Sequence, residues 1–342
     1  MMNPDWQEFL RAQGARIADG TVGDFGNLDA ELVCAREATI ISPLTHLGII
    51  ECFGEDARTF LQNQLTSDVN HLEAGSAQHS SWCSPKGRML ASFVLFRRDS
   101  AYLALLSADL REFIQKRLQI YVLRSKVKIS DRSTDHELIG VSGPHAEAAL
   151  QSAGLPIPAA PMQTTAISNA TVIRLDNTRY ILVIASEAAP SVWNALSTHA
   201  KAAGTAAWQW LDIQAGLPLI TGPTREAFVP QMANLDKIGG VSFHKGCYPG
   251  QEVVARTQYL GKVKRHLYRF HASSPIVPGM QVSAVESPEH ACGMVANTSP
   301  APGGGYAGLA IVLEGTIASS ELRVSLQDGE SIALKNLTIV GD

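Results

Sequence analysis

The order of strand-like and helix-like segments in the first part of the chain constrains its fold more than any other feature. β-Branched and aromatic residues mark the strands, and apolar residues at helical spacing mark the helices between them. The order is strand, helix, two strands, helix and strand, over residues 40–53, 54–65, 87–107, 109–123 and 126–130. This is the order of a split β-α-β unit, so the sequence predicts a ferredoxin-like layer.

A similar order of segments follows in the next part of the chain. The pattern predicts a strand and a helix over residues 136–154, two strands around Asp176 and Asn177, and another helix over residues 189–204. The two parts share no strict sequence repeat, but the common order indicates a structural duplication. We therefore predict a second α+β unit.

The C-terminal part of the chain has a different residue pattern from the two α+β units. Its short apolar runs are separated by segments rich in Pro, Gly and Ser, which is typical of a small antiparallel β-barrel or sandwich. The predicted fold class is α+β, with two ferredoxin-like layers and a C-terminal antiparallel β-barrel. We place the first unit at residues 1–135, the second at 136–245, and a loop, a connecting helix and the barrel at 246–342.

Composition excludes several classes of protein. The 342 residues are 45% hydrophobic and 18% charged, which is typical of a folded chain and not of a disordered one. A net charge of -4 gives the whole molecule no electrostatic footprint for nucleic acid, so direct nucleic-acid binding is not expected. No segment approaches the ~20 consecutive apolar residues that span a bilayer, and the N-terminus does not resemble a secretory signal. We expect a cytoplasmic protein without a membrane anchor.

The cysteines point to a reducing compartment. They are scattered singly, and no C-x-x-C pair suggests a zinc ion or an iron-sulfur cluster bound by this chain alone, so no metal is predicted. Four of them fit the role of small buried hydrophobic residues, and only Cys247 has chemically unusual neighbours. The five are Cys34, Cys52, Cys83, Cys247 and Cys292.

The stretch HKGCYPGQE, residues 244–252, concentrates reactive and turn-forming residues. Pro249 and Gly250 suit the two central positions of a type II turn, and a helix is predicted to follow. The positive end of that helix and the cation of Lys245 would favour the thiolate form of Cys247. The residue types equally allow a tight structural loop in which the cysteine fills a small gap and the lysine is solvated.

Nearby residues could recognise a ligand. Gln251 and Glu252 can together donate and accept hydrogen bonds, as reading a flat heterocycle requires, and Arg256 opens a basic run that could hold an anionic tail. Trp210 and Gln214 share one face of a predicted helix and offer an aromatic platform beside an amide. The alternatives are a helix-start carboxylate, a solvated charged face and an ordinary core helix.

The segment NLDKIGGVSFHKGCYPGQEVVAR, residues 234–256, resembles the signature of the YgfZ family of folate-binding proteins. The family motif K-G-C-Y-x-G-Q-E is present in full from Lys245 to Glu252. The resemblance extends over about residues 41–270. Supporting stretches occur in the family's order: FLQNQLTSDV at 60–69, CSPKGRMLASFVLF at 83–96, LDIQAGLPLI at 211–220 and FVPQMANLD at 228–236.

The resemblance implies a paralogue of the glycine-cleavage T-protein, an aminomethyltransferase. That fold has three domains in a ring around a tetrahydrofolate-binding hole, with a discontinuous first domain. The resemblance therefore allows our two α+β units to exchange segments. The family is linked to the assembly or repair of iron-sulfur proteins, including radical enzymes that methylthiolate tRNA. The family cysteine falls on Cys247 and its lysine on Lys245, the predicted catalytic residues. The predicted folate-binding residues are Trp210, Gln214, Tyr248, Gln251, Glu252 and Arg256.

Two positions depart from the pattern of these relatives. Where the T-protein has an acidic pair that includes its catalytic aspartate, this chain has Leu90, Ala91 and Ser92, so aminomethyl transfer is not expected. The family usually has a glutamate that contacts the pterin where this chain has Gln214. An amide can still accept a hydrogen bond but lacks the charge.

The leading prediction is a monomer that binds reduced folate and supports iron-sulfur client proteins, such as tRNA-methylthiolating enzymes, through Cys247. One alternative is a folate-dependent one-carbon transferase that acts on an amine or RNA acceptor and uses Glu252 or His244 as its base. A second alternative is an interaction scaffold that has lost folate binding.

Overall fold

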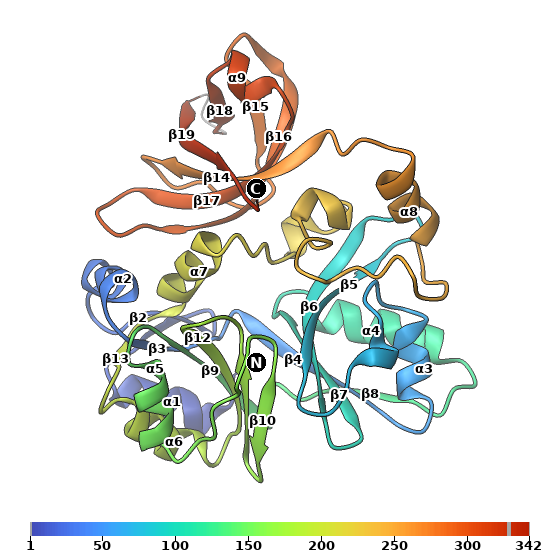
Figure 1. The fold of residues 1–342 in the computed structure, drawn as a ribbon. Coiled ribbons are helices and arrows are strands. Elements are labelled where there is room, and N and C mark those ends of the chain that lie inside the picture. Colours follow the sequence, from blue (N-terminus) through green and yellow to red (C-terminus); the bar gives the residue numbers. More distant parts are fainter. Residues whose placement is uncertain (1, 327–329, 342) are drawn as a thin grey trace. The chain divides into compact units, whose positions relative to one another are not determined.

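The computed structural model describes residues 2–326 and 330–341, which divide into two units (Figure 1). The first unit contains the chain up to Leu61, Val69–Gln78 and Phe93–Trp208, and the second contains Gln62–Asp68, His79–Ser92 and the chain from Gln209 onwards. Two short segments from the first third of the sequence therefore belong to the second unit, where they help to build the candidate site.

A six-stranded sheet in the first unit has the strand order β10-β11-β12-β9-β3-β13. Its neighbouring strands run antiparallel, except that β13 pairs in parallel with β3. Almost every residue of β11 and β12 is buried, so the centre of the sheet is covered on both faces. The strands are β3 (Ile40–Pro43), β9 (His136–Ser142), β10 (Thr164–Ile167), β11 (Ala170–Arg174), β12 (Arg179–Ala185) and β13 (Lys201–Ala202).

Helices α1, α5 and α6 share one hydrophobic core with this sheet (Figure 1). Trp6 of α1 meets Trp193 of α6 edge to face, with ring centroids 5.7 Å apart. The side chain of Asn3 caps α1 by accepting from two backbone N–H groups of the first turn. The remaining elements of this region are α1 (Pro4–Ala12), β1 (Arg16–Ala18), β2 (Thr21–Asp24), α2 (Leu28–Glu37), α5 (Ala146–Ser152) and α6 (Ala189–Leu196).

A five-stranded sheet has the order β5-β6-β7-β4-β8, and the division between the units passes through β6. Helix α4 packs on β4 and β8 through a stripe that includes the buried residues Ile114 and Leu118. The elements are β4 (Leu47–Phe53), α3 (Ala57–Gln62), η1 (Val69–His71), β5 (Ala77–Cys83), β6 (Met89–Arg98), β7 (Ala101–Ser107), α4 (Arg111–Val122) and β8 (Lys128–Asp131).

The second unit contains a closed barrel with the strand order β14-β17-β16-β15-β18-β19. Phe270, Val282 and Val312 belong to the core that fills it. The barrel strands are β14 (Arg265–Ala272), β15 (Gln281–Ala284), β16 (Ser287–Pro300), β17 (Tyr306–Leu313), β18 (Leu322–Ser325) and β19 (Ser331–Ile339). The helices outside the first unit are η2 (Gly222–Thr224), η3 (Pro230–Ala233), α8 (Gln251–Tyr259) and α9 (Thr316–Ser319), and α7 (Thr205–Gln214) crosses the division.

The structure confirms the predicted fold class. Between β4 and β8 it contains the predicted α3, β6, β7 and α4, together with β5, a strand that had not been predicted. The helix predicted over residues 189–204 ends at Leu196, and Lys201–Ala202 form β13. Other details differ as well. Strand β3, which the pattern placed with the first layer, pairs with β9 in the other sheet. Helix α3 ends at Gln62, before Leu65, which the sequence pattern included in the helix. The N-terminal helices and the β1-β2 hairpin had not been predicted.

Candidate functional site

The loop at residues 244–252 contains the turn that the sequence predicts. The backbone N–H of Gln251 donates to the carbonyl oxygen of Tyr248 at 3.2 Å, which closes a four-residue turn. Gly250, the third residue of this turn, has φ 80° and ψ 4°, as position i+2 of a type II turn requires. Helix α8 begins directly afterwards at Gln251. The predicted Pro-Gly turn and the predicted helix are both confirmed.

The side chain of Lys245 is buried, with 8% of the residue exposed. Its Nζ donates to the carbonyl oxygens of Gln62, Leu65 and Ser67 at 2.6, 2.6 and 2.8 Å, a set that we call the carbonyl cage. An ammonium group has three N–H donors, so the cage satisfies all of them. Burial lowers the pKa of Lys245 to about 8, and the charge of Asp68 acts in the opposite direction. At neutral pH the lysine is therefore mainly a protonated clamp between two distant chain segments.

Thr66 lies inside the cage segment and ties it to β5 and to the start of the loop. Its Oγ1 donates to the carbonyl oxygen of Gly240 at 2.7 Å. Its backbone N–H donates to the carbonyl oxygen of Ser81 at 2.9 Å, and the N–H of Ser81 donates back to Thr66 Oγ1 at 2.9 Å. The N–H of Ser242 donates to the carbonyl oxygen of Thr66, also at 2.9 Å. The cage segment is thus fixed independently of the lysine.

Two glycines allow the loop to pack against the turn at residues 84–88. Gly250 has φ 80° and Gly87 has φ 70°, a region that favours glycine. A Cβ atom on Gly250 would lie 2.4 Å from the carbonyl oxygen of Ser84 and 2.6 Å from the Cα of Gly87. A Cβ atom on Gly87 would lie 2.8 Å from the Cβ of Val253 in α8. The two segments therefore meet backbone to backbone.

Cys247 is exposed, whereas Lys245 and Tyr248 on either side are 8% and 6% exposed. The Nζ of Lys245 lies 5.3 Å from the ring centroid of Tyr248, which is a cation–π contact. Burial raises the pKa of Tyr248. Cys83 in β5 contrasts with Cys247, because it is buried and burial raises the pKa of its thiol to about 12. The loop presents one accessible thiol between two anchored side chains.

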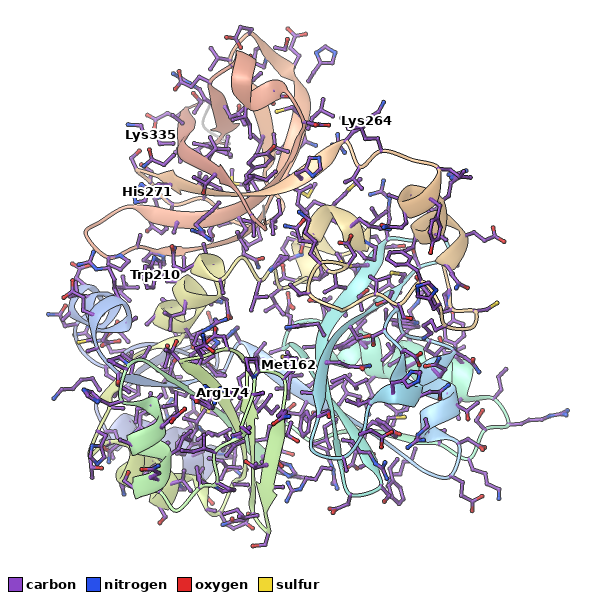
Figure 2. The ribbon with its side chains drawn as sticks, viewed as in Figure 1. Met162, Arg174, Trp210, Lys264, His271 and Lys335 are labelled. Carbon is purple, nitrogen blue, oxygen red and sulfur yellow. The ribbon has the colours of Figure 1, made fainter. Side chains whose placement is uncertain are left out.

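Trp210 and Gln214 lie one turn apart on α7, and both are half-buried (Figure 2 labels Trp210). Nη2 of Arg269 donates to the carbonyl oxygen of Gln214 at 2.7 Å and so fixes the end of the helix. Among the residues that the structure describes, no hydrogen bond engages the side-chain amide of Gln214. The ring and the amide remain available to a ligand.

The other predicted site residues lie on α8. Nε2 of Gln251 is 3.5 Å from the carbonyl oxygen of Lys245, so this side chain stays within the loop. Glu252 occupies the first turn, where the helix dipole favours a carboxylate, and both Glu252 and Arg256 are exposed. The structure therefore brings Lys245, Tyr248 and Gln251 together, and places Glu252 and Arg256 at the surface. The catalytic and binding roles of these residues stay predictions.

The three positions that replace the acidic pair of the T-protein lie inside β6. Leu90, Ala91 and Ser92 are each less than a tenth exposed. Oγ of Ser92 accepts a hydrogen bond from the N–H of Ile220 at 3.1 Å. These positions carry the packing of a core strand and no carboxylate.

Comparison with known proteins gives the family of the chain. Residues 24–163 match the family model described as the GCVT N-terminal domain. The tRNA-modifying protein YgfZ of Klebsiella pneumoniae (strain 342) is 36% identical over 248 residues, which are 71% of this chain and 75% of that protein. The chain belongs to the YgfZ family. The YgfZ protein of Yersinia pseudotuberculosis (serotype O:1b, strain IP 31758) is 34% identical over 242 residues, 70% of this chain and 73% of that protein.

The fold of this YgfZ-family chain can also be compared with a solved structure. The glycine cleavage system aminomethyltransferase T from Bartonella henselae matches with a TM-score of 0.76 at 19% identity, over 96% of this chain and 94% of that protein. At this identity the likeness concerns the fold alone. The aminomethyltransferase-like fold that the sequence predicts is confirmed. In the part of the chain that the structure describes, no helix combines the length and apolar character needed to cross a bilayer.

Lys245 could be predicted as a site residue from the sequence, but its three carbonyl partners could not. The cage consists of main-chain carbonyl oxygens, which every residue type carries, so no side-chain pattern reveals it. The one available signal was the stretch FLQNQLTSDV at residues 60–69, which is one of the stretches that resemble the family. It now has a structural role as the segment that receives the lysine.

Two glycines on either side of Cys247 test the packing of the loop. Gly250→Ala should lower the free energy of unfolding by about 1–3 kcal/mol, because its Cβ would collide with backbone atoms and its φ is positive. Gly246→Ala is the matched control, since its Cβ would meet nothing within 4 Å. We expect a change of no more than about 0.5 kcal/mol for that variant. Urea unfolding measures both, and equal stabilities would refute the close backbone packing.

Proposed function

We propose that this YgfZ-family protein binds tetrahydrofolate and supports the assembly or repair of iron-sulfur enzymes that modify tRNA. Its relatives are named tRNA-modifying proteins, which supports the link to tRNA. The observation that carries the proposal is the exposed thiol of Cys247, held between buried Lys245 and Tyr248. Such a thiol is accessible to a client protein, while the loop that carries it is fixed.

Lys245 acts in this proposal as a positioning residue. Its ammonium group is within 2.8 Å of three carbonyl oxygens, so all its donors are engaged by the main chain. The lysine sets the position of the loop, and Cys247 carries out the chemistry. Enzymes that modify tRNA act in the cytoplasm, so a protein that supports them would act there too. We propose that it acts as a monomer.

The residues present fit a reduced pterin. Trp210 offers an aromatic face, and the unused amide of Gln214 one turn away can both donate and accept hydrogen bonds. We assign Tyr248, Gln251, Glu252 and Arg256 to the remainder of the folate site, with the cation of Arg256 suited to a carboxylate tail. When bound, tetrahydrofolate supplies a carrier for one-carbon units.

The transferase alternative has less support. Transfer of an aminomethyl group in the T-protein depends on an acidic residue, and the corresponding positions Leu90, Ala91 and Ser92 are buried in β6. Glu252 and His244, which could replace that base, are both exposed. The scaffold alternative predicts no binding of tetrahydrofolate, so a titration with that ligand tests it.

Replacement of Cys247 tests the thiol role in cells. In a strain that lacks the native protein, Cys247→Ser should fail to restore methylthiolated nucleosides in tRNA, as measured by mass spectrometry of digested tRNA. The purified variant should unfold at the same urea concentration as the native chain, because the side chain is exposed. Cys34→Ser, at a half-buried thiol on α2, is the control that should restore the modification. Full activity of Cys247→Ser would remove the thiol from the proposal.

Calorimetric titration with tetrahydrofolate tests the ligand. The native chain should bind it, and Gln214→Glu should bind it roughly tenfold more tightly, because a charged acceptor strengthens a hydrogen bond to the ring. Gln209→Glu, on the same helix, adds the same charge without the predicted contact and should leave affinity unchanged. If neither the native chain nor Gln214→Glu binds, the folate role is wrong and the scaffold alternative stands.

A further inference from the structure

Large apolar side chains are exposed where helix α8 ends and the chain enters the barrel. Tyr259, the last residue of α8, is 63% exposed, and Leu260 after it is 86% exposed. Leu313, at the end of β17, is 37% exposed. Lys262 Nζ lies 2.9 Å from Glu314 Oε2, so the segment after α8 contacts the end of β17. We call Tyr259, Leu260 and Leu313 the apolar patch; exposed apolar clusters with a polar rim are typical of interaction sites.

Positive charges border the apolar patch. The segment that leads from α8 to β14 carries Lys262, Lys264 and Arg265 (Figure 2 labels Lys264). Arg265 lies opposite Leu313 in the register of β14 and β17. Glu314 neutralises Lys262, whereas Lys264 and Arg265 are exposed and form no ion pair within residues 2–326 and 330–341. The charges of these two cations are therefore available to a partner.

Helix α8 joins the apolar patch to the loop that carries Cys247. The helix begins at Gln251, just after the loop, and its nine residues span roughly 14 Å at 1.5 Å per residue. On the other side of Cys247, the ring of Phe243 meets the ring of Tyr259 at 72°, with centroids 6.0 Å apart. The chain on both sides of the thiol thus reaches the patch.

The chemistry of this surface indicates the class of partner. Apolar side chains gain free energy by covering the patch, and carboxylates are attracted to the two cations. Leu260 and Leu313 have no aromatic face on which a nucleic-acid base could stack. The net charge of the chain is -4, which also disfavours RNA. An acidic protein segment with apolar side chains of its own matches both the patch and its charged border.

We propose that the apolar patch, with Lys264 and Arg265, docks an acidic segment of the client protein that also carries apolar side chains. The inference rests on the function proposed above and adds how the client is recognised. Contact with the patch holds the client, and the cations attract it as it approaches. Because α8 spans only roughly 14 Å, a docked client lies close to Cys247.

The test measures the Kd of the full chain for a purified enzyme that methylthiolates tRNA, by biolayer interferometry. Leu260→Glu and Lys264→Glu should each raise the Kd roughly tenfold, because one puts a charge into the patch and the other repels an acidic segment. Ile120→Glu and Arg124→Glu make the same changes at exposed positions of the first unit and should leave the Kd unchanged. Lys264→Arg keeps the charge and should bind as the native chain does.

Further titrations decide the class of partner. Binding of the enzyme should weaken as NaCl rises from about 0.05 to about 0.5 M, because salt screens exposed charges. Bulk tRNA and vesicles of phosphatidylglycerol should show no difference between the native chain and Leu260→Glu. The proposal is overturned if the native chain does not bind the enzyme, if Leu260→Glu binds it equally well, or if Leu260→Glu instead loses binding of tRNA or of the vesicles.

A cellular assay separates this inference from the proposed function. Leu260→Glu should bind tetrahydrofolate and unfold in urea as the native chain does, because the side chain is exposed. In a strain that lacks the native protein, it should fail to restore methylthiolated nucleosides in tRNA. If Leu260→Glu restores them while Cys247→Ser does not, the docking surface is wrong and the proposed function stands. If Cys247→Ser also restores them, the thiol role itself is wrong.

Discussion

The candidate site depends on one buried cation. Removing an ammonium group from water is costly, and a buried lysine persists only when its donors are satisfied. Lys245 meets this condition with three main-chain carbonyl oxygens at 2.6–2.8 Å, all from the segment between Gln62 and Ser67. The same contacts join parts of the chain that are about 180 residues apart in sequence. The loop therefore has a defined position relative to β5 and to the turn before β6.

This anchoring explains how an exposed thiol can belong to a fixed structure. Lys245 and Tyr248 hold the chain on either side of Cys247, and Gly250 holds the following turn against Gly87. A cysteine on a mobile loop would sample many positions, whereas this one is presented at a constant place. The structure also assigns the lysine a different task from the one that its sequence position suggests. Its charge is used by the main chain, two residues away from the sulfur.

Much of the fold could be predicted from the sequence because turns, helices and strands leave patterns in residues that are close together in the chain. The Pro249-Gly250 turn, the start of α8 and the elements α3, β6, β7, α4 and β8 follow from spacing and residue type, whereas β5 had not been predicted. Other features depend on partners that no local pattern names. The pattern of α3 continued to Leu65, but the chain leaves the helix at Gln62 and its next carbonyl oxygens accept from Lys245.

The most direct measurement is the free energy of unfolding of Lys245→Met compared with Lys264→Met, an exposed lysine near the start of β14 (Figure 2). Both changes keep the apolar stem and remove the charge. Loss of the ammonium group removes three hydrogen bonds to carbonyl oxygens of buried residues, so Lys245→Met should be less stable by about 3 kcal/mol or more, while Lys264→Met changes little. Equal stability of the two variants would contradict the account, because the loop would then hold its position without the lysine.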